Sequence, residues 1–282
     1  MKFDIARQPL VPAFMTLFAL AVAAMCAGIP VPDTETSGAV REALPLLGGQ
    51  LARFQAAYPV WSKFAAGFML LFAGMCTGRI SIRYNLYTVG TCLPIPLYAI
   101  VACGIATGGN YLAGFAASML LALATKNYCR AFCNGYGFDA IFRASLYLGL
   151  MPLIYAPALP LLLLLPLAVL LFRRTFREVV VATAGLLLPI FTACYVSWGT
   201  GAEFTAPLIK LGQSAIEGMP LHLFLDIPLP ALVMAGGIVL LDLTALFFFL
   251  ADIYAAGTKP RFILFYNIGI LVLALTLLCS PA

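Results

Sequence analysis

Residues 142–174 read FRASLYLGLMPLIYAPALPLLLLLPLAVLLFRR, an apolar run with arginine near its start and at its end. The apolar part covers about 31 residues, whereas one helix needs only about 20 to cross a hydrocarbon layer. A single helix would place Arg143 and Arg173 on opposite sides of a membrane. A tight turn between Tyr155 and Pro160 would return both arginines to one side, so we predict a helical hairpin. The prolines that interrupt the run are Pro152, Pro157, Pro160 and Pro166.

The composition predicts that most of the chain lies in lipid. Of the 282 residues, 63% are apolar and 10% are charged, whereas soluble domains are about half apolar and about a quarter charged. Apolar segments long enough to cross a bilayer recur along the chain. We predict an all-α polytopic membrane helix bundle in which residues 1–282 form one integral membrane domain. The nine predicted transmembrane helices cover about residues 10–32, 60–77, 88–106, 111–127, 140–157, 158–172, 179–198, 229–252 and 262–279.

The basic residues predict the orientation of these helices. With the N-terminus in the cytoplasm, all but four of the 16 Lys and Arg residues fall on the cytoplasmic side, as the positive-inside rule requires. The exceptions are Arg41, Arg53, Lys63 and Lys210. We therefore expect a multi-pass protein of the bacterial inner membrane with a cytoplasmic N-terminus and a periplasmic C-terminus.

Two predicted outer loops, about 33–59 and 199–228, are long enough to fold. The first has the pattern of one or two short amphipathic helices that lie on the outer leaflet. The second contains His222 and Asp226, which would lie one helical turn apart and could act as an acid–base pair. The alternative interpretation of these two residues is a solvated loop surface.

Arginine is the main charged residue of the predicted cytoplasmic side. A guanidinium group binds phosphate through two parallel hydrogen bonds, so these arginines could hold the headgroup of an anionic lipid. Alternatively, they only orient the helices. Asp139 is predicted to pair with Arg143, and Glu178 with Arg174, because each pair is four residues apart. We call the following residues the arginine rim: Arg79, Arg83, Arg130, Asp139, Arg143, Arg173, Arg174 and Arg177.

Asp242 lies near the centre of the eighth predicted helix. A carboxyl group at that depth costs about 3 kcal/mol, so it should face the bundle interior or a wet cavity. It is either a proton or cation site, or an acid hydrogen-bonded to a neighbouring helix.

Metal, cofactor and nucleic-acid sites are not predicted. Cys129 and Cys133 would lie one helical turn apart, but the chain has no second such pair and only one His. The eight cysteines lie within predicted helices or on the cytoplasmic side, which argues against structural disulfides. Phosphate-binding glycine loops, nucleophile elbows and nucleic-acid-binding basic patches are absent from the sequence.

Several segments between residues 75 and 195 carry a resemblance to known proteins. They are Phe138-Asp-Ala140, Leu153-Ile-Tyr-Ala-Pro-Ala-Leu159, Arg173-Arg-Thr-Phe-Arg-Glu-Val179, Gly185-Leu-Leu-Leu-Pro189 and the stretch from Arg79 to Tyr98. In these segments the chain resembles a family of uncharacterised multi-pass inner-membrane proteins of Bacteroidota. The resemblance implies an inner-membrane location and transfers no activity.

A second, faint resemblance concerns Asp33-Thr-Glu35, which follows the first predicted helix. The organisation is similar to that of membrane glycosyltransferases that use polyprenyl-phosphate sugars, in which an acidic pair occupies this place. The resemblance implies catalytic roles for Asp33 and Glu35.

These observations favour a component of envelope biogenesis that binds an anionic lipid or a membrane partner protein. One alternative is a glycosyltransferase with a polyprenyl-phosphate donor and chemistry at Asp33 or Glu35. Another is a small permease with Asp242 in its pathway. The sequence leaves open whether the protein is an enzyme.

Overall fold

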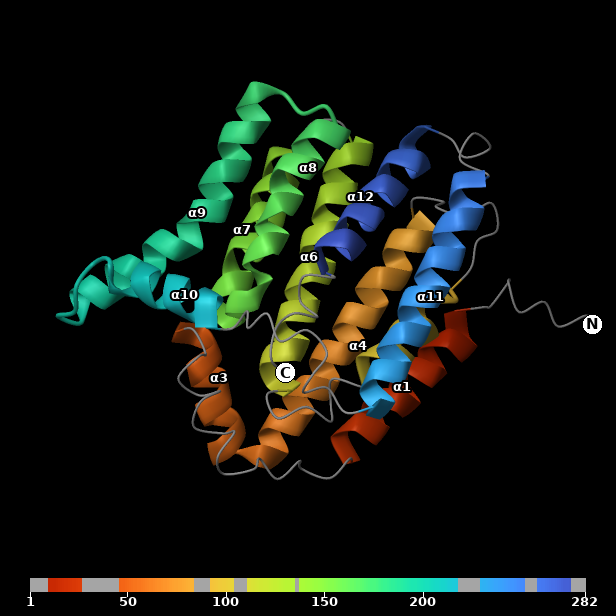
Figure 1. Ribbon diagram of the computed structural model, residues 1–282, viewed down its shortest axis with the longest axis horizontal. Coiled ribbons are helices and arrows are strands. Elements are labelled where there is room, and N and C mark those ends of the chain that lie inside the picture. The colour runs from red at the N-terminus through yellow and green to blue at the C-terminus, as the bar shows by residue number, and fades with distance from the viewer. Residues whose placement is uncertain are drawn as a thin grey trace, which may run out of the picture.

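The computed structural model describes residues 10–26, 46–83, 92–103, 111–134, 137–217, 229–251 and 258–274. These residues form eleven α-helices and one 3-10 helix, with no strand among them (Figure 1). The predicted all-α class is therefore confirmed for this part of the chain. Of the described helices, α4 (Pro59–Arg83) and α9 (Phe176–Gly199) are long and apolar enough to cross a membrane.

Helices overlap all nine segments predicted as transmembrane helices. Besides α4 and α9 they are α1 (Leu10–Cys26), α5 (Pro94–Cys103), α6 (Tyr111–Asn134), α7 (Phe138–Ile154), η2 (Ala156–Leu163) continued by α8 (Leu164–Leu171), α11 (Leu229–Ala251) and α12 (Thr258–Ala274). Two more helices lie in the predicted outer loops: α3 (Leu46–Ala57) in the first and α10 (Ala206–Glu217) in the second. The apolar segments thus located the helices, although several ends differ.

The apolar run at residues 142–174 folds as the predicted hairpin. Helix α7 ends at Ile154, Tyr155 has an extended backbone, and η2 begins at Ala156. Pro157 lies in the first turn of η2, where a missing N–H group costs no helical hydrogen bond. Buried residues of both arms, such as Leu148 and Leu161, belong to one apolar cluster. The start of α7 and the end of α8 therefore lie at the same end of the bundle (Figure 1).

Small residues allow close approach between the first helices. Met25 lies against Gly67 and Leu17 lies against Gly74, so α1 and α4 run antiparallel. The start of α1 is thereby brought to the end of α4 that carries Arg83.

Helices α7 and α9 pack even more closely, backbone against backbone. A Cβ atom at Gly149 would overlap the carbonyl oxygen of Leu186 on α9. A Cβ atom at Gly185 would lie 2.7 Å from the carbonyl oxygen of Phe142 on α7. Only glycine fits at these two positions, as at many close contacts between membrane helices.

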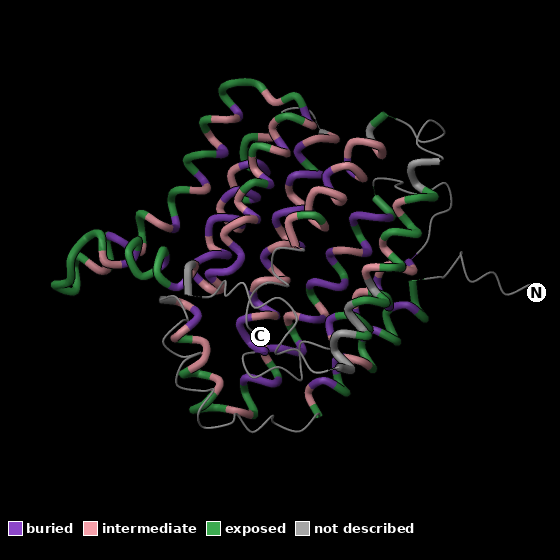
Figure 2. The backbone as a smooth tube through the Cα atoms, in the orientation of Figure 1, coloured by how far each residue is buried: buried purple, intermediate pink, exposed green. Residues whose placement is uncertain are grey.

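Some helices bury small residues and expose large apolar ones. Helix α1 buries Ala13, Ala21 and Ala24 but exposes Phe14 and Phe18. Exposed segments run along the outer faces of many helices (Figure 2), and large apolar side chains are common among them. The described helices therefore leave an extensive apolar surface uncovered.

Candidate anion-binding pocket

A cavity of about 420 Å³ lies between α1, α4, α5 and α6. Its basic side chains are Arg79 and Arg83 of α4 and Lys126 of α6. The other lining residues are Leu10, Phe72, Met75, Cys76, Gly78, Ile82 and Ile95. The pocket thus combines three cationic groups with an apolar lining, which is the pattern needed to hold an amphiphilic anion.

The pocket exists because α4 continues beyond its predicted end at residue 77. Arg79 and Arg83 are four residues apart in its last turns, so both lie on the same face of the helix. Their positive charges also suit the negative end of the helix dipole. A side chain at Gly78 would collide with Ile95, so glycine here lets the start of α5 approach and line the cavity.

Lys126 belongs to the pocket although the sequence analysis did not assign it to the arginine rim. Its Nζ donates a hydrogen bond to Cys76 Sγ at 3.8 Å, which joins α6 to α4. The sequence did contain a signal, because Lys126 and Arg79 both lie next to the cytoplasmic ends of predicted helices. Equal depth alone, however, does not show that two helices are neighbours.

The predicted ion pair between Asp139 and Arg143 is confirmed. Arg143 Nε donates to Asp139 Oδ1 at 2.8 Å within the first turns of α7. The two side chains are 57% and 66% exposed, Arg143 first. Neither residue lines the pocket.

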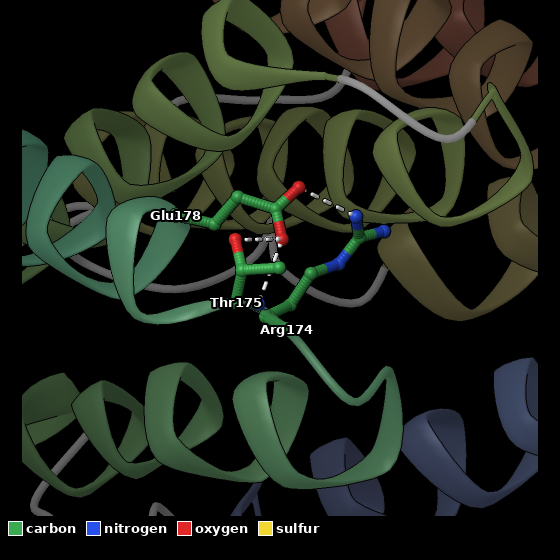
Figure 3. A network of polar contacts seen from close by, with 3 residues as sticks. All are labelled: Arg174, Thr175 and Glu178. Atoms are coloured by element: carbon green, nitrogen blue, oxygen red, sulfur yellow. Dashed lines mark hydrogen bonds and ion pairs between the residues drawn. The ribbon is translucent and has the colours of Figure 1, made fainter.

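The second predicted ion pair, between Arg174 and Glu178, is also confirmed and is far more buried (Figure 3). Arg174 Nη1 donates to Glu178 Oε1 at 3.0 Å. The other carboxylate oxygen accepts hydrogen bonds from the backbone N–H and the hydroxyl group of Thr175, at 3.0 and 3.2 Å. Arg174 and Glu178 are only 11% and 7% exposed. The guanidinium of Arg174 is therefore engaged by a carboxylate of the protein itself.

The remaining rim arginines, Arg130, Arg173 and Arg177, are exposed at helix ends. Arg173 has a φ of 47°, a left-handed conformation that is uncommon for residues other than glycine. The pocket lining includes none of these three residues. The structure thus divides the arginine rim, and only Arg79 and Arg83 are brought to the pocket.

Four other candidates, Asp33, Glu35, His222 and Asp226, lie outside the described residues. Asp242 lies on α11 and is partly buried, but it does not line the pocket. Among the described residues, no cluster of His, Cys, Asp and Glu could hold a metal ion.

Comparison of the chain with family models, with curated proteins and with solved structures gives no match. The resemblance to the uncharacterised inner-membrane family stays a prediction.

Proposed function

We propose that this chain is a polytopic protein of the bacterial inner membrane, with about nine transmembrane helices, that binds an anionic lipid at its cytoplasmic end. The observation that carries the proposal is the pocket in which Arg79, Arg83 and Lys126 meet an apolar lining. An envelope-biogenesis role follows if the bound lipid belongs to that process.

The distribution of side chains supports the membrane location. Exposing apolar surface to water costs about 25 cal/mol per Å², whereas the same surface costs nothing in lipid. The many exposed Phe, Leu and Val side chains of α1, α4, α9 and α11 are therefore explained by a hydrocarbon surrounding. Small buried residues at helix contacts are the usual arrangement there.

The lining of the pocket favours a lipid over a small soluble anion. Guanidinium and ammonium groups bind phosphate oxygens strongly. A free phosphate would satisfy these groups but leave Phe72, Met75 and Ile82 against water. A lipid headgroup with its attached chain would cover both the basic and the apolar residues.

The test compares two variants for the anionic lipid that copurifies with them, measured by native mass spectrometry. Replacing Arg79, Arg83 and Lys126 together by glutamine should reduce the bound anionic lipid at least about tenfold, since each charged hydrogen bond contributes over 1 kcal/mol. The control is Arg143→Gln, which removes a rim arginine outside the pocket. Equal lipid retention by both variants would refute the proposal.

A membrane partner protein is the second candidate ligand, and α11 favours it. This helix exposes Val233, Leu240 and Phe247. A Cβ atom at Gly236 or Gly237 would have no described atom within 4 Å. An apolar helix face with small residues at its centre allows close packing of a helix from another protein. A photocrosslinker at Leu240 should then capture protein, whereas capture of lipid alone would count against this candidate.

A further inference from the structure

The three basic side chains of the pocket are distributed along one face of α4. Arg79 and Arg83 belong to α4 itself, and Lys126 Nζ reaches this helix at Cys76, 3.8 Å from its Sγ. Positions 76, 79 and 83 share a face because they are three and four residues apart. From Cys76 to Arg83 the helix rises by about 10 Å, at 1.5 Å per residue. The three cationic groups therefore enter the pocket at separate levels.

These three groups form no ion pair with a described carboxylate. The ion pairs found among the described residues engage other arginines, Arg143 with Asp139 and Arg174 with Glu178. Among the described residues that line the pocket, none is acidic. The negative charge that compensates the pocket must therefore come from the ligand.

This charge distinguishes between kinds of anionic lipid. A headgroup with a single phosphodiester, such as that of phosphatidylglycerol, carries one negative charge and would leave two of the three cations uncompensated. Gathering all three cations around one phosphate would also bring like charges together, and they repel each other. Two phosphates joined by a short linker would compensate two of the charges at separate levels of the helix.

Apolar side chains from three helices surround the basic groups. Helix α1 supplies Leu10, α5 supplies Ile95, and α4 supplies Phe72 and Met75. A soluble diphosphate would leave these side chains against water, which is unfavourable. Acyl chains attached beside each of two phosphates would cover them.

We infer that the ligand of the basic pocket is a lipid with two separate phosphodiester groups, of the cardiolipin class. Arg83 binds one phosphate and Lys126 the other, with Arg79 between them. Basic pockets between transmembrane helices on the cytoplasmic side suit such a headgroup. This inference rests on the proposed function, because it names the lipid whose headgroup the pocket binds.

The experiment compares cardiolipin, phosphatidylglycerol and phosphatidic acid with identical acyl chains. Full-length protein in detergent is titrated with each lipid, and bound lipid is measured by native mass spectrometry. Cardiolipin should bind at least about tenfold more tightly than either lipid with one phosphate, because its second phosphate adds charged hydrogen bonds. Equal affinities for all three lipids would overturn the inference and leave the anionic-lipid proposal intact. Binding of none would refute both.

A competition with inorganic pyrophosphate separates a lipid ligand from a soluble one. Pyrophosphate at the same concentration should not displace cardiolipin, because it holds its two phosphates together and covers no apolar side chain. Displacement would assign the pocket to a soluble diphosphate and overturn the inference.

Single charge removals test whether both ends of the pocket are used. Arg83→Gln and Lys126→Gln should each lower the preference for cardiolipin over phosphatidylglycerol at least about fivefold, because each variant removes the cation of one phosphate. The matched control is Arg143→Gln, which removes the same charge from an exposed position outside the pocket and should keep the preference. A preference that survives both pocket variants, or that falls equally in the control, would overturn the inference.

Discussion

At the scale of single residues, two ion pairs with the same sequence spacing have different surroundings. Glu178 is buried and accepts three hydrogen bonds, from Arg174 and from two groups of Thr175. Asp139 and Arg143 form one exposed contact. Removing one partner of a buried pair costs about 3–5 kcal/mol because the other charge loses its partner. An exposed pair contributes about 0.5 kcal/mol or less.

We therefore predict that Glu178→Ala lowers the free energy of unfolding in detergent by about 3 kcal/mol. Asp139→Ala should lower it by about 0.5 kcal/mol at most. Reversible unfolding followed by circular dichroism measures both. Equal losses would show that the Glu178 carboxylate does not stabilise the turn between α8 and α9.

At the scale of elements, apolar length and proline position were enough to predict the helices and the hairpin. The hairpin prediction followed from the positive-inside rule, which favours a fold that keeps Arg143 and Arg173 on the same side of the predicted membrane. Helix ends were less predictable, since α4 reaches Arg83 and α6 reaches Asn134, beyond the predicted residues 77 and 127. Apolar length measures the distance through hydrocarbon, whereas a helix continues as long as its backbone hydrogen bonds do. Polar residues such as Arg79 and Arg130 therefore lie in the extended ends of these helices.

Contact between α7 and α9 gives the prediction at this scale. Alanine favours a helix over glycine by about 1 kcal/mol, so Gly236→Ala, at an open position of α11, should be neutral or slightly stabilising. Gly149→Ala should instead destabilise by about 1–3 kcal/mol, because its Cβ atom overlaps the Leu186 carbonyl group. Thermal unfolding of both variants in detergent measures the difference. Stabilisation by both substitutions would mean that α7 and α9 are not in close contact.

At the scale of the whole molecule, the pocket was only half predictable. The composition and the predicted topology indicated that Arg79 and Arg83 lie at the basic end of the bundle. Whether these arginines lie beside Lys126, Leu10 and Ile95 depends on which helices are neighbours. The hydropathy of the sequence does not indicate which helices pack against each other. The glycines at helix contacts determine the neighbours, because Gly74 admits Leu17 of α1 and Gly78 admits Ile95 of α5.

The proposed function places the basic end of the bundle in the cytoplasm, which gives the last prediction. Arg143 is exposed at the start of α7, and Lys210 is exposed on α10 in the second predicted outer loop. In a Cys26→Ser background, an impermeant maleimide should label Lys210→Cys in intact spheroplasts, because this loop is predicted to be periplasmic. Arg143→Cys should be labelled only after the inner membrane is made permeable. The background protein without either new cysteine reports labelling of the native thiols. Labelling of Arg143→Cys in intact spheroplasts would invert the topology and place the pocket of Arg79, Arg83 and Lys126 on the periplasmic side.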